Sequence, residues 1–165
     1  MHNHAPTEYI CPFCLLLQGM ENSHTELGQT DIVFQTAEAT ALMATRTWPD
    51  NPGHVLVIPN RHFENIYDLP AGIALEIHSL SREIALAMKA VYGCDGITLQ
   101  QSNEPAGDQK IWHYHLHVIG RYSNDKFHNS TKEDFPPAQR AEYAGKLRSW
   151  MENHRESTNE RSNIL

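Results

Sequence analysis

The sequence lacks a long hydrophobic run. Hydrophobic residues make up 40% of the chain, but no apolar stretch approaches the ~20 residues that a helix needs to cross a bilayer. The N-terminal stretch MHNHAPTEYICPF also lacks a basic region followed by an apolar core, so it does not have the pattern of a secretory signal. We therefore expect a cytoplasmic protein that has no membrane partner.

An excess of positive charge is absent as well. Lys and Arg number 13 against 20 Asp and Glu, which gives a formal net charge of −7. Non-specific binding of nucleic acid depends mainly on Lys and Arg side chains that neutralise phosphates. The composition therefore argues against a nucleic-acid partner. It does not exclude a small phosphorylated ligand, because such a ligand needs only a few local positive groups.

Cysteine is scarce, with three residues that cannot all pair within one chain. Cys11 and Cys14 form a C-x-x-C pair, and Cys94 stands alone in YGCDG. An odd count in a cytoplasmic chain argues against a disulfide framework. The pair then has three interpretations: a redox pair, half of a zinc site, or a chance spacing. No βαβ pattern surrounds it, which disfavours a thioredoxin-like role.

What the sequence does contain is a mixed set of strand and helix patterns. Short apolar and β-branched runs predict strands at 31–37, 40–46, 54–60, 96–103 and 111–120. From Ile73 to Val91, apolar residues recur every three or four positions, which predicts a long helix that ends at Gly93. A second long helix is expected to begin near Pro136 and to end near Asn153.

These elements predict an α+β fold, with an antiparallel sheet of about five strands, one long central helix and a C-terminal helix. The length of 165 residues suits one domain with one core. We place this domain at residues 11–153, between a flexible arm at 1–10 and a polar tail at 154–165. No repeat, low-complexity tract or linker divides it.

The stretch IWHYHLHVIGRY carries the strongest chemical pattern. His113, His115 and His117 occupy alternate positions, and side chains in a strand alternate between its two faces. We therefore expect three imidazoles on one face, opposite an apolar and aromatic face. Three interpretations follow: a solvated strand face, a metal site, or a nucleophilic imidazole that attacks phosphorus while its neighbours hold the phosphate oxygens.

The run HYHLHVI resembles the signature of the histidine triad superfamily of nucleotide hydrolases and transferases. The resemblance extends from Cys11 to about Arg121. CPFC is similar to the N-terminal knuckle of that family, NPGHVLVIPNRHFENIYDL to its second block, and NEPAGDQKIWHYHLHVIGRY to its third. The resemblance implies the HIT-like fold and a homodimer in which the sheet continues across the interface.

The resemblance also implies roles for individual residues. His115, in the middle of the triad, is expected to attack the α-phosphorus and to carry the nucleotide, and His117 and His113 complete the catalytic row. His54 is expected to border the phosphate pocket. Asn103 and Gln109 match polar loop residues that contact substrate, and Phe13 and Leu16 fall where the family packs the nucleobase.

A zinc-containing subset of the family implies a structural zinc ion. Its ligands match Cys11, Cys14, His62 and His113 in this sequence. Two thiolates and two imidazoles form a closed tetrahedral zinc site. The alternative is that the two cysteines are reduced thiols near a turn.

Three residues depart from the family pattern. Arg46 replaces the usual Asp or Asn that holds the ribose hydroxyls, and Arg cannot accept a hydrogen bond. Asp108 replaces a Gly, and Lys110 replaces a Ser or Thr. Arg46 favours an additional phosphate or a different sugar, and Lys110 suits a polyphosphate leaving group. The alternative is that both residues only add surface charge.

Together with the histidine row, the resemblance implies a hydrolase or nucleotidyl transferase that acts on purine nucleotides. The expected substrate is a dinucleoside polyphosphate or a nucleoside phosphoramidate, which reacts through a nucleotidyl-histidine intermediate. One alternative is a zinc-stabilised module that binds a nucleotide or a partner with little turnover. A weaker alternative is a metal-dependent hydrolase that holds its metal on the triad.

Overall fold

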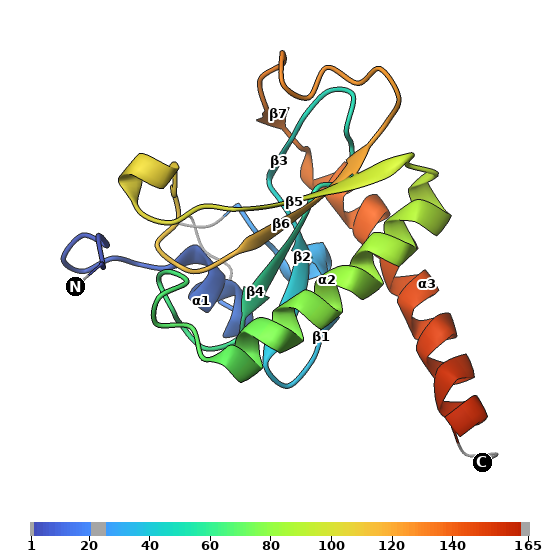
Figure 1. The fold of residues 1–165 in the computed structure, drawn as a ribbon, viewed down its shortest axis with the longest axis horizontal. Coiled ribbons are helices and arrows are strands. Elements are labelled where there is room, and N and C mark those ends of the chain that lie inside the picture. Colours follow the sequence, from blue (N-terminus) through green and yellow to red (C-terminus); the bar gives the residue numbers. More distant parts are fainter. Residues whose placement is uncertain (1, 21–25, 163–165) are drawn as a thin grey trace.

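The computed structural model describes residues 2–20 and 26–162. Its main feature is one antiparallel sheet with the strand order β1-β2-β4-β6-β5 (Figure 1). The strands are β1 Ile32–Gln35, β2 Ala39–Met43, β4 Val55–Pro59, β5 Gly96–Gln101 and β6 Leu116–Arg121. The predicted α+β class and the five-stranded antiparallel sheet are therefore confirmed.

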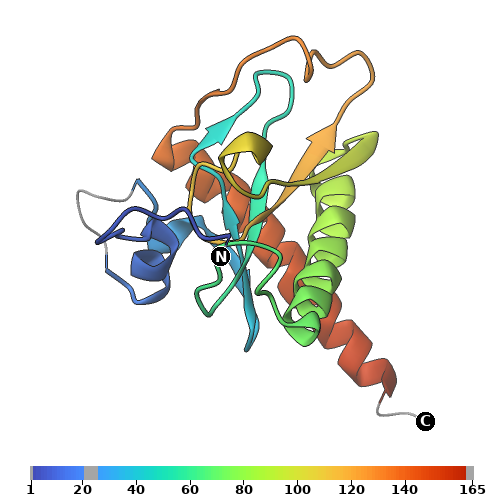
Figure 2. The same ribbon diagram turned by 60° about the vertical axis from the view of Figure 1, so that its left-hand side comes forward.

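Two long helices cover one face of this sheet, and a short helix lies over the other (Figures 1 and 2). The helices are α1 Pro12–Leu17, α2 Ala71–Tyr92 and α3 Pro137–Ser162, and two 3-10 turns, η1 Gln29–Asp31 and η2 Pro105–Gly107, lie between them. The predicted central helix is confirmed, and Gly93 ends it with φ 65° in the left-handed region. No helix in the described parts of the chain is long and apolar enough to span a membrane.

Side-chain alternation along the strands separates the two faces. Val55 and Val57 of β4 pack in the main core with α2 and α3, whereas Leu56 and Ile58 pack in a second cluster with Phe13 of α1. In the register, His117 of β6 is paired with Leu56. His117 therefore lies on the face that α2 and α3 leave free, and that face carries the candidate site.

The histidine-containing strand is shorter than predicted. The sequence places it at 111–120, but β6 begins at Leu116, so only His117 of the triad lies in a strand. Leu116 is the first paired residue of β6 in both ladders, where its partners are Val57 of β4 and Gln101, the residue at which β5 ends. The backbone N–H of Tyr114 instead donates to the oxygen of Phe63 at 2.6 Å.

The C-terminal helix is longer than predicted. The expected end near Asn153 is wrong, because α3 continues to Ser162. At the other end of the chain, the predicted arm lies against the domain: the backbone N–H groups of His4 and Ala5 donate to the buried carboxylate of Glu64. The domain limits that we drew from the sequence stay a prediction.

A second, two-stranded sheet was not predicted. It joins β3, Arg46–Thr47, to β7, Glu133–Asp134, in an antiparallel pair at one end of the main sheet (Figure 1). The segment 122–136 leaves β6, crosses this end of the domain and returns through β7 to α3. It thus comes to border the site.

Candidate active site and metal centre

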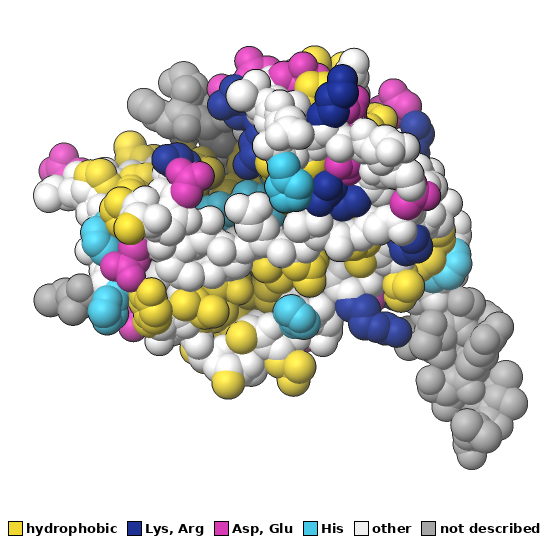
Figure 3. Space-filling view, turned by 45° about the horizontal axis from the view of Figure 1, so that its top comes forward, with side chains coloured by type: hydrophobic (Ala, Val, Ile, Leu, Met, Phe, Trp, Pro, Cys, Tyr) yellow, Lys and Arg dark blue, Asp and Glu magenta, His cyan; other side chains and the backbone are white. Residues whose placement is uncertain are grey.

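A cavity of about 550 Å³ opens on the face of the sheet opposite α2 and α3. One part of its wall is apolar and consists of Pro12, Phe13, Leu27, Ala44, Leu56 and Ile111. The other part carries His54, His115 and His117, with Arg46, Lys110 and Lys132 nearby. Figure 3 shows histidine side chains inside a hollow that Lys and Arg side chains border. The cavity thus combines an apolar wall with a wall that suits an anion.

His115 is held in one tautomer by the backbone. Its Nδ1 lies 2.7 Å from the oxygen of His113. Because a carbonyl oxygen only accepts, Nδ1 carries the proton and Nε2 keeps its lone pair. Burial lowers the pKa of His115 to about 4, and the side chain lines the cavity. His115 is therefore a neutral imidazole whose free nitrogen is available as a nucleophile.

His54 orients His117 through a chain of two hydrogen bonds. His54 donates from Nδ1 to the oxygen of Arg46 at 2.8 Å and accepts at Nε2 from Nδ1 of His117, also at 2.8 Å. Burial lowers the pKa of His54 to about 3 and lowers the pKa of His117 as well. His117 is thus left with Nε2 as the atom that can take up a proton.

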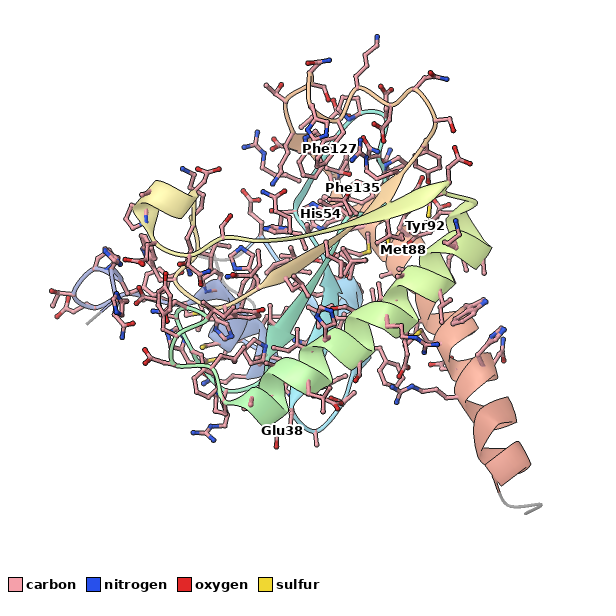
Figure 4. All side chains as sticks on the ribbon, viewed as in Figure 1. Glu38, His54, Met88, Tyr92, Phe127 and Phe135 are labelled. Atoms are coloured by element: carbon pink, nitrogen blue, oxygen red, sulfur yellow. The ribbon has the colours of Figure 1, made fainter. Side chains whose placement is uncertain are left out.

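Two aromatic side chains pack in series beside His54. Its ring lies 5.3 Å from that of Trp48, which in turn lies 4.3 Å from the ring of Phe127. Figure 4 shows His54 at the end of the sheet where the segment with Phe127 and Phe135 passes. The segment 122–136 therefore supports the wall of the cavity.

Beside the cavity, four side chains form a metal-binding geometry. The ligand atoms of Cys11, Cys14, His62 and His113 all lie within 4.8 Å of one another. Nδ1 of His113 is 3.3 Å from the Cys11 sulfur and 3.7 Å from the Cys14 sulfur, and Nδ1 of His62 is 3.4 Å from the Cys14 sulfur. In a tetrahedral zinc site, sulfur and nitrogen ligands lie about 3.6 Å apart. The four residues therefore fit a zinc ion.

The protonation states of this cluster suit a metal as well. His113 donates from Nε2 to the oxygen of Pro59 at 3.0 Å, which leaves the lone pair on Nδ1, the atom that faces the two sulfurs. Hydrogen bonds from Cys14, His113 and His62 lower the pKa of Cys11, although burial acts in the opposite direction. Among the described residues, the only group of this kind contains His113 and does not contain His115 or His117.

Three of the predicted substrate residues do not line the cavity. Leu16 is fully buried in the cluster under α1. Gln109 donates to the oxygens of Glu64 and Ile111 and accepts from the N–H of Glu104. Asn103 accepts from the N–H of Ile66 at 2.8 Å. In this structure both polar residues hold the loop that leads to the triad, and their contact with substrate stays a prediction.

Comparison with known proteins agrees with this geometry. The family model of the HIT domain matches residues 27–124, which is more than half of the chain. The chain belongs to the HIT domain family. An uncharacterised HIT-like protein of Saccharolobus solfataricus is similar to it, with 26% identity over 128 residues that cover 78% of this chain and 84% of the relative.

Two further HIT proteins are similar along most of their length. The bis(5'-adenosyl)-triphosphatase of Dictyostelium discoideum is 27% identical over 138 residues, which cover 79% of this chain and 91% of the relative. The crystal structure of a zinc-bound histidine triad family protein from Mycobacterium smegmatis has a TM-score of 0.73 and 24% identity. The match covers 89% of this chain and 96% of that one. The likeness to this structure supports the HIT fold.

In this HIT domain, the departures at Arg46, Asp108 and Lys110 lie at the mouth of the cavity. Lys110 pairs with Asp108 at 2.6 Å, and Arg46 pairs with Asp134 at 3.4 Å. Both pairs are largely exposed. The unusual Asp108 is therefore the partner of the unusual Lys110, and the charges of both predicted phosphate-binding cations are already compensated.

Lys132 lines the cavity but was not predicted as a site residue from the sequence. This residue lines the cavity of the HIT domain together with His115 and His117, although it lies in a polar stretch with no recognisable pattern. Its position depends on the pairing of β7 with β3, which joins residues far apart in the chain. The one local sign is its place shortly before Pro136, near which the predicted C-terminal helix begins.

Proposed function

We propose that this HIT protein is a hydrolase that acts at the α-phosphorus of a dinucleoside polyphosphate or a nucleoside phosphoramidate. The observation that carries the proposal is the hydrogen bond from Nδ1 of His115 to the oxygen of His113, which leaves Nε2 free in a cavity shared with His117. The apolar wall around Phe13 and Leu56 suits a purine base. The named relative that cleaves bis(5'-adenosyl) triphosphate makes such a substrate a reasonable choice.

The reaction takes two steps in this proposal. The lone pair of Nε2 of His115 forms a bond to the α-phosphorus, and the bond to the leaving oxygen or nitrogen breaks with its electron pair on the leaving group. Water then attacks the same phosphorus, the phosphorus–nitrogen bond breaks, and Nε2 recovers its lone pair. A proton held at Nε2 of His117 passes to the leaving group as the first bond breaks, and Nε2 of His117 recovers one proton from the attacking water in the second step. The products are a nucleoside monophosphate and the protonated leaving group.

We further propose that Cys11, Cys14, His62 and His113 hold one structural zinc ion. When bound, zinc would fix the ring of His113 by coordination and stabilise the fold. The support is the ligand geometry together with the name of the zinc-bound relative. Because β6 begins directly after this segment, a fixed His113 also fixes the backbone oxygen that orients His115.

A homodimer is part of the same proposal. β5 is an edge strand of the sheet, so its outer hydrogen-bonding groups can pair with a second copy of the chain. Leu99 on β5 and Leu75 and Leu86 on α2 are exposed apolar side chains. A second copy joined at β5 would continue the sheet and cover apolar surface. The cytoplasmic location also remains a prediction.

The test is turnover of radiolabelled diadenosine triphosphate and of adenosine 5'-phosphoramidate. We expect His115→Ala to lower kcat by about a thousandfold or more, because the nucleophile is lost. His78→Ala removes an exposed imidazole from α2 and serves as the matched control. A nucleotide trapped on His115 after an acid quench would support the intermediate. Binding without turnover in the wild type would instead favour the alternative of a nucleotide-binding module.

A further inference from the structure

Lys132 is brought to the cavity by the segment that returns from β6. The residue directly after it starts β7, where Glu133 is paired with Thr47 and Asp134 with Arg46. Arg46 also donates from its guanidinium to the backbone oxygen of Lys132 at 3.2 Å. The pairing of β3 with β7 and the hydrogen bond from Arg46 therefore hold the backbone of Lys132 in place.

The Lys132 ammonium lies over the ring of Trp48, which packs beside His54. Its Nζ is 4.5 Å from the centre of the Trp48 ring. The same ring lies 5.3 Å from the ring of His54. A cation on an indole face is held in place by the charge distribution of the ring. The side chain thus has a fixed position on the wall that His54, His115 and His117 share.

Lys132 has no carboxylate at ion-pair distance within the described residues. Arg46 and Lys110, the other two cations on the wall, each have such a partner. Burial lowers the pKa of Lys132, and the more distant carboxylate of Asp108 acts in the opposite direction. A half-buried ammonium that lines the cavity without a direct ion pair is stabilised by a bound anion.

We propose that Lys132 binds a second phosphoryl group of the substrate, in addition to the α-phosphate that lies between His115 and His117. The inference rests on the proposed hydrolase function and makes substrates with at least two phosphoryl groups the preferred ones. The second group has two sources to distinguish: the polyphosphate of the leaving group, or a phosphate on the ribose, where Arg46 replaces the usual Asp or Asn.

Three substrates separate these cases. Adenosine 5'-phosphoramidate has a single phosphoryl group, diadenosine triphosphate has further phosphates in the leaving group, and the 3'-phosphorylated form of the phosphoramidate has one on the ribose. For Lys132→Gln we expect kcat/KM to fall about tenfold or more on one of the two phosphate-rich substrates. On the simple phosphoramidate the change should stay below about threefold. The substrate that loses rate identifies the source.

Lys126→Gln is the matched control, because Lys126 is an exposed lysine of the same segment that does not line the cavity. Lys132→Arg keeps the charge and should retain most of the rate. Equal losses on all three substrates, or no loss on any, would overturn the inference while the hydrolase proposal stands. If the wild type cleaves none of them, the hydrolase proposal fails. The Kd values of adenosine monophosphate, diphosphate and 3',5'-bisphosphate then decide, and equal values in wild type and Lys132→Gln overturn the inference.

Discussion

The backbone oxygen of His113 accepts a hydrogen bond from Nδ1 of His115 at 2.7 Å, while the imidazole of the same His113 lies 3.3 Å from the Cys11 sulfur. One residue therefore belongs to two sites. Its side chain is part of the Cys2His2 cluster, and its main chain sets the tautomer of the proposed nucleophile. Any change that moves His113 should thus affect catalysis without touching the substrate.

The first prediction concerns the metal. The purified protein should contain about one zinc ion per chain, and Cys11→Ser should lose that zinc and unfold at a lower temperature. Because His113 also orients His115, kcat should fall about tenfold or more, with a smaller change in KM. Elemental analysis by mass spectrometry, a thermal melt and steady-state kinetics measure the three effects.

Cys94 provides the control for this experiment. It is buried in the main core, apart from the cluster, so Cys94→Ala should keep its zinc. Full zinc occupancy in Cys11→Ser would refute the proposed ligand set. A metal-free wild type of unchanged kcat would refute the link between the metal and His115.

The second prediction concerns His54, a positioning residue that acts through His117. His54→Leu removes the acceptor for Nδ1 of His117 and should lower kcat about tenfold to a hundredfold. His54→Gln should recover much of the rate, because its amide can donate to the Arg46 oxygen and its carbonyl can accept from His117. Equal activity of the Leu and Gln variants would show that His54 only fills space.

The sequence was sufficient to predict much of this site. The resemblance to the histidine triad family predicted that Cys11, Cys14, His62 and His113 lie together, and the structure brings their ligand atoms within 4.8 Å of one another. The β-branched run of β4 and the apolar face of α2 are local patterns. They predicted the sheet and the long helix because each pattern reports burial directly.

The errors have a common physical cause. The start of β6 depends on where its pairing with the two neighbouring strands ends, at Val57 and Gln101. Likewise β3 and β7 have two residues each and form only because they meet each other. Long-range pairing of this kind leaves no periodic signal in a single sequence. Lys132 was missed for this reason, although it lines the same cavity as the triad.

The third prediction concerns acid stability. The carboxylate of Asp125 is 3% exposed and accepts from Arg121 at 2.7 Å and from Asn51 at 2.6 Å. The hydrogen bond from Arg121 is the largest of the effects that lower the pKa of Asp125. In the unfolded chain an Asp has a pKa of about 3.9. As the pH falls, Asp125 of the unfolded chain therefore binds a proton at a higher pH than Asp125 of the folded chain.

The stabilisation from Asp125 is thus complete above about pH 4 and is lost as pH falls below it. Asp125→Asn should lower the free energy of unfolding at pH 7 by about 2 kcal/mol. The loss should shrink as the pH falls toward 3, since the wild type loses the same interactions. Urea denaturation at pH 7, 5 and 3 measures this difference. A constant difference across the three values would contradict the assignment.

The fourth prediction compares Gly72 and Gly93, which lie at the two ends of α2 and differ in backbone conformation. Gly93 ends the helix at φ 65°, ψ 25°, whereas Gly72 lies in its first turn. A Cβ added at either position would meet no atom within 4 Å, so neither substitution creates a clash. Gly93→Ala should nevertheless lower the free energy of unfolding by about 1–2 kcal/mol, because a Cβ disfavours the left-handed region. Gly72→Ala should raise it by about 0.5 kcal/mol, because alanine has less freedom in the unfolded chain.

The stability of Gly93→Asn should fall between those of the two alanine variants, since Asn tolerates the left-handed region better than Ala. Urea denaturation of the three variants measures the order, and equal stabilities of Gly93→Ala and Gly72→Ala would show that the turn after α2 adopts another conformation in solution.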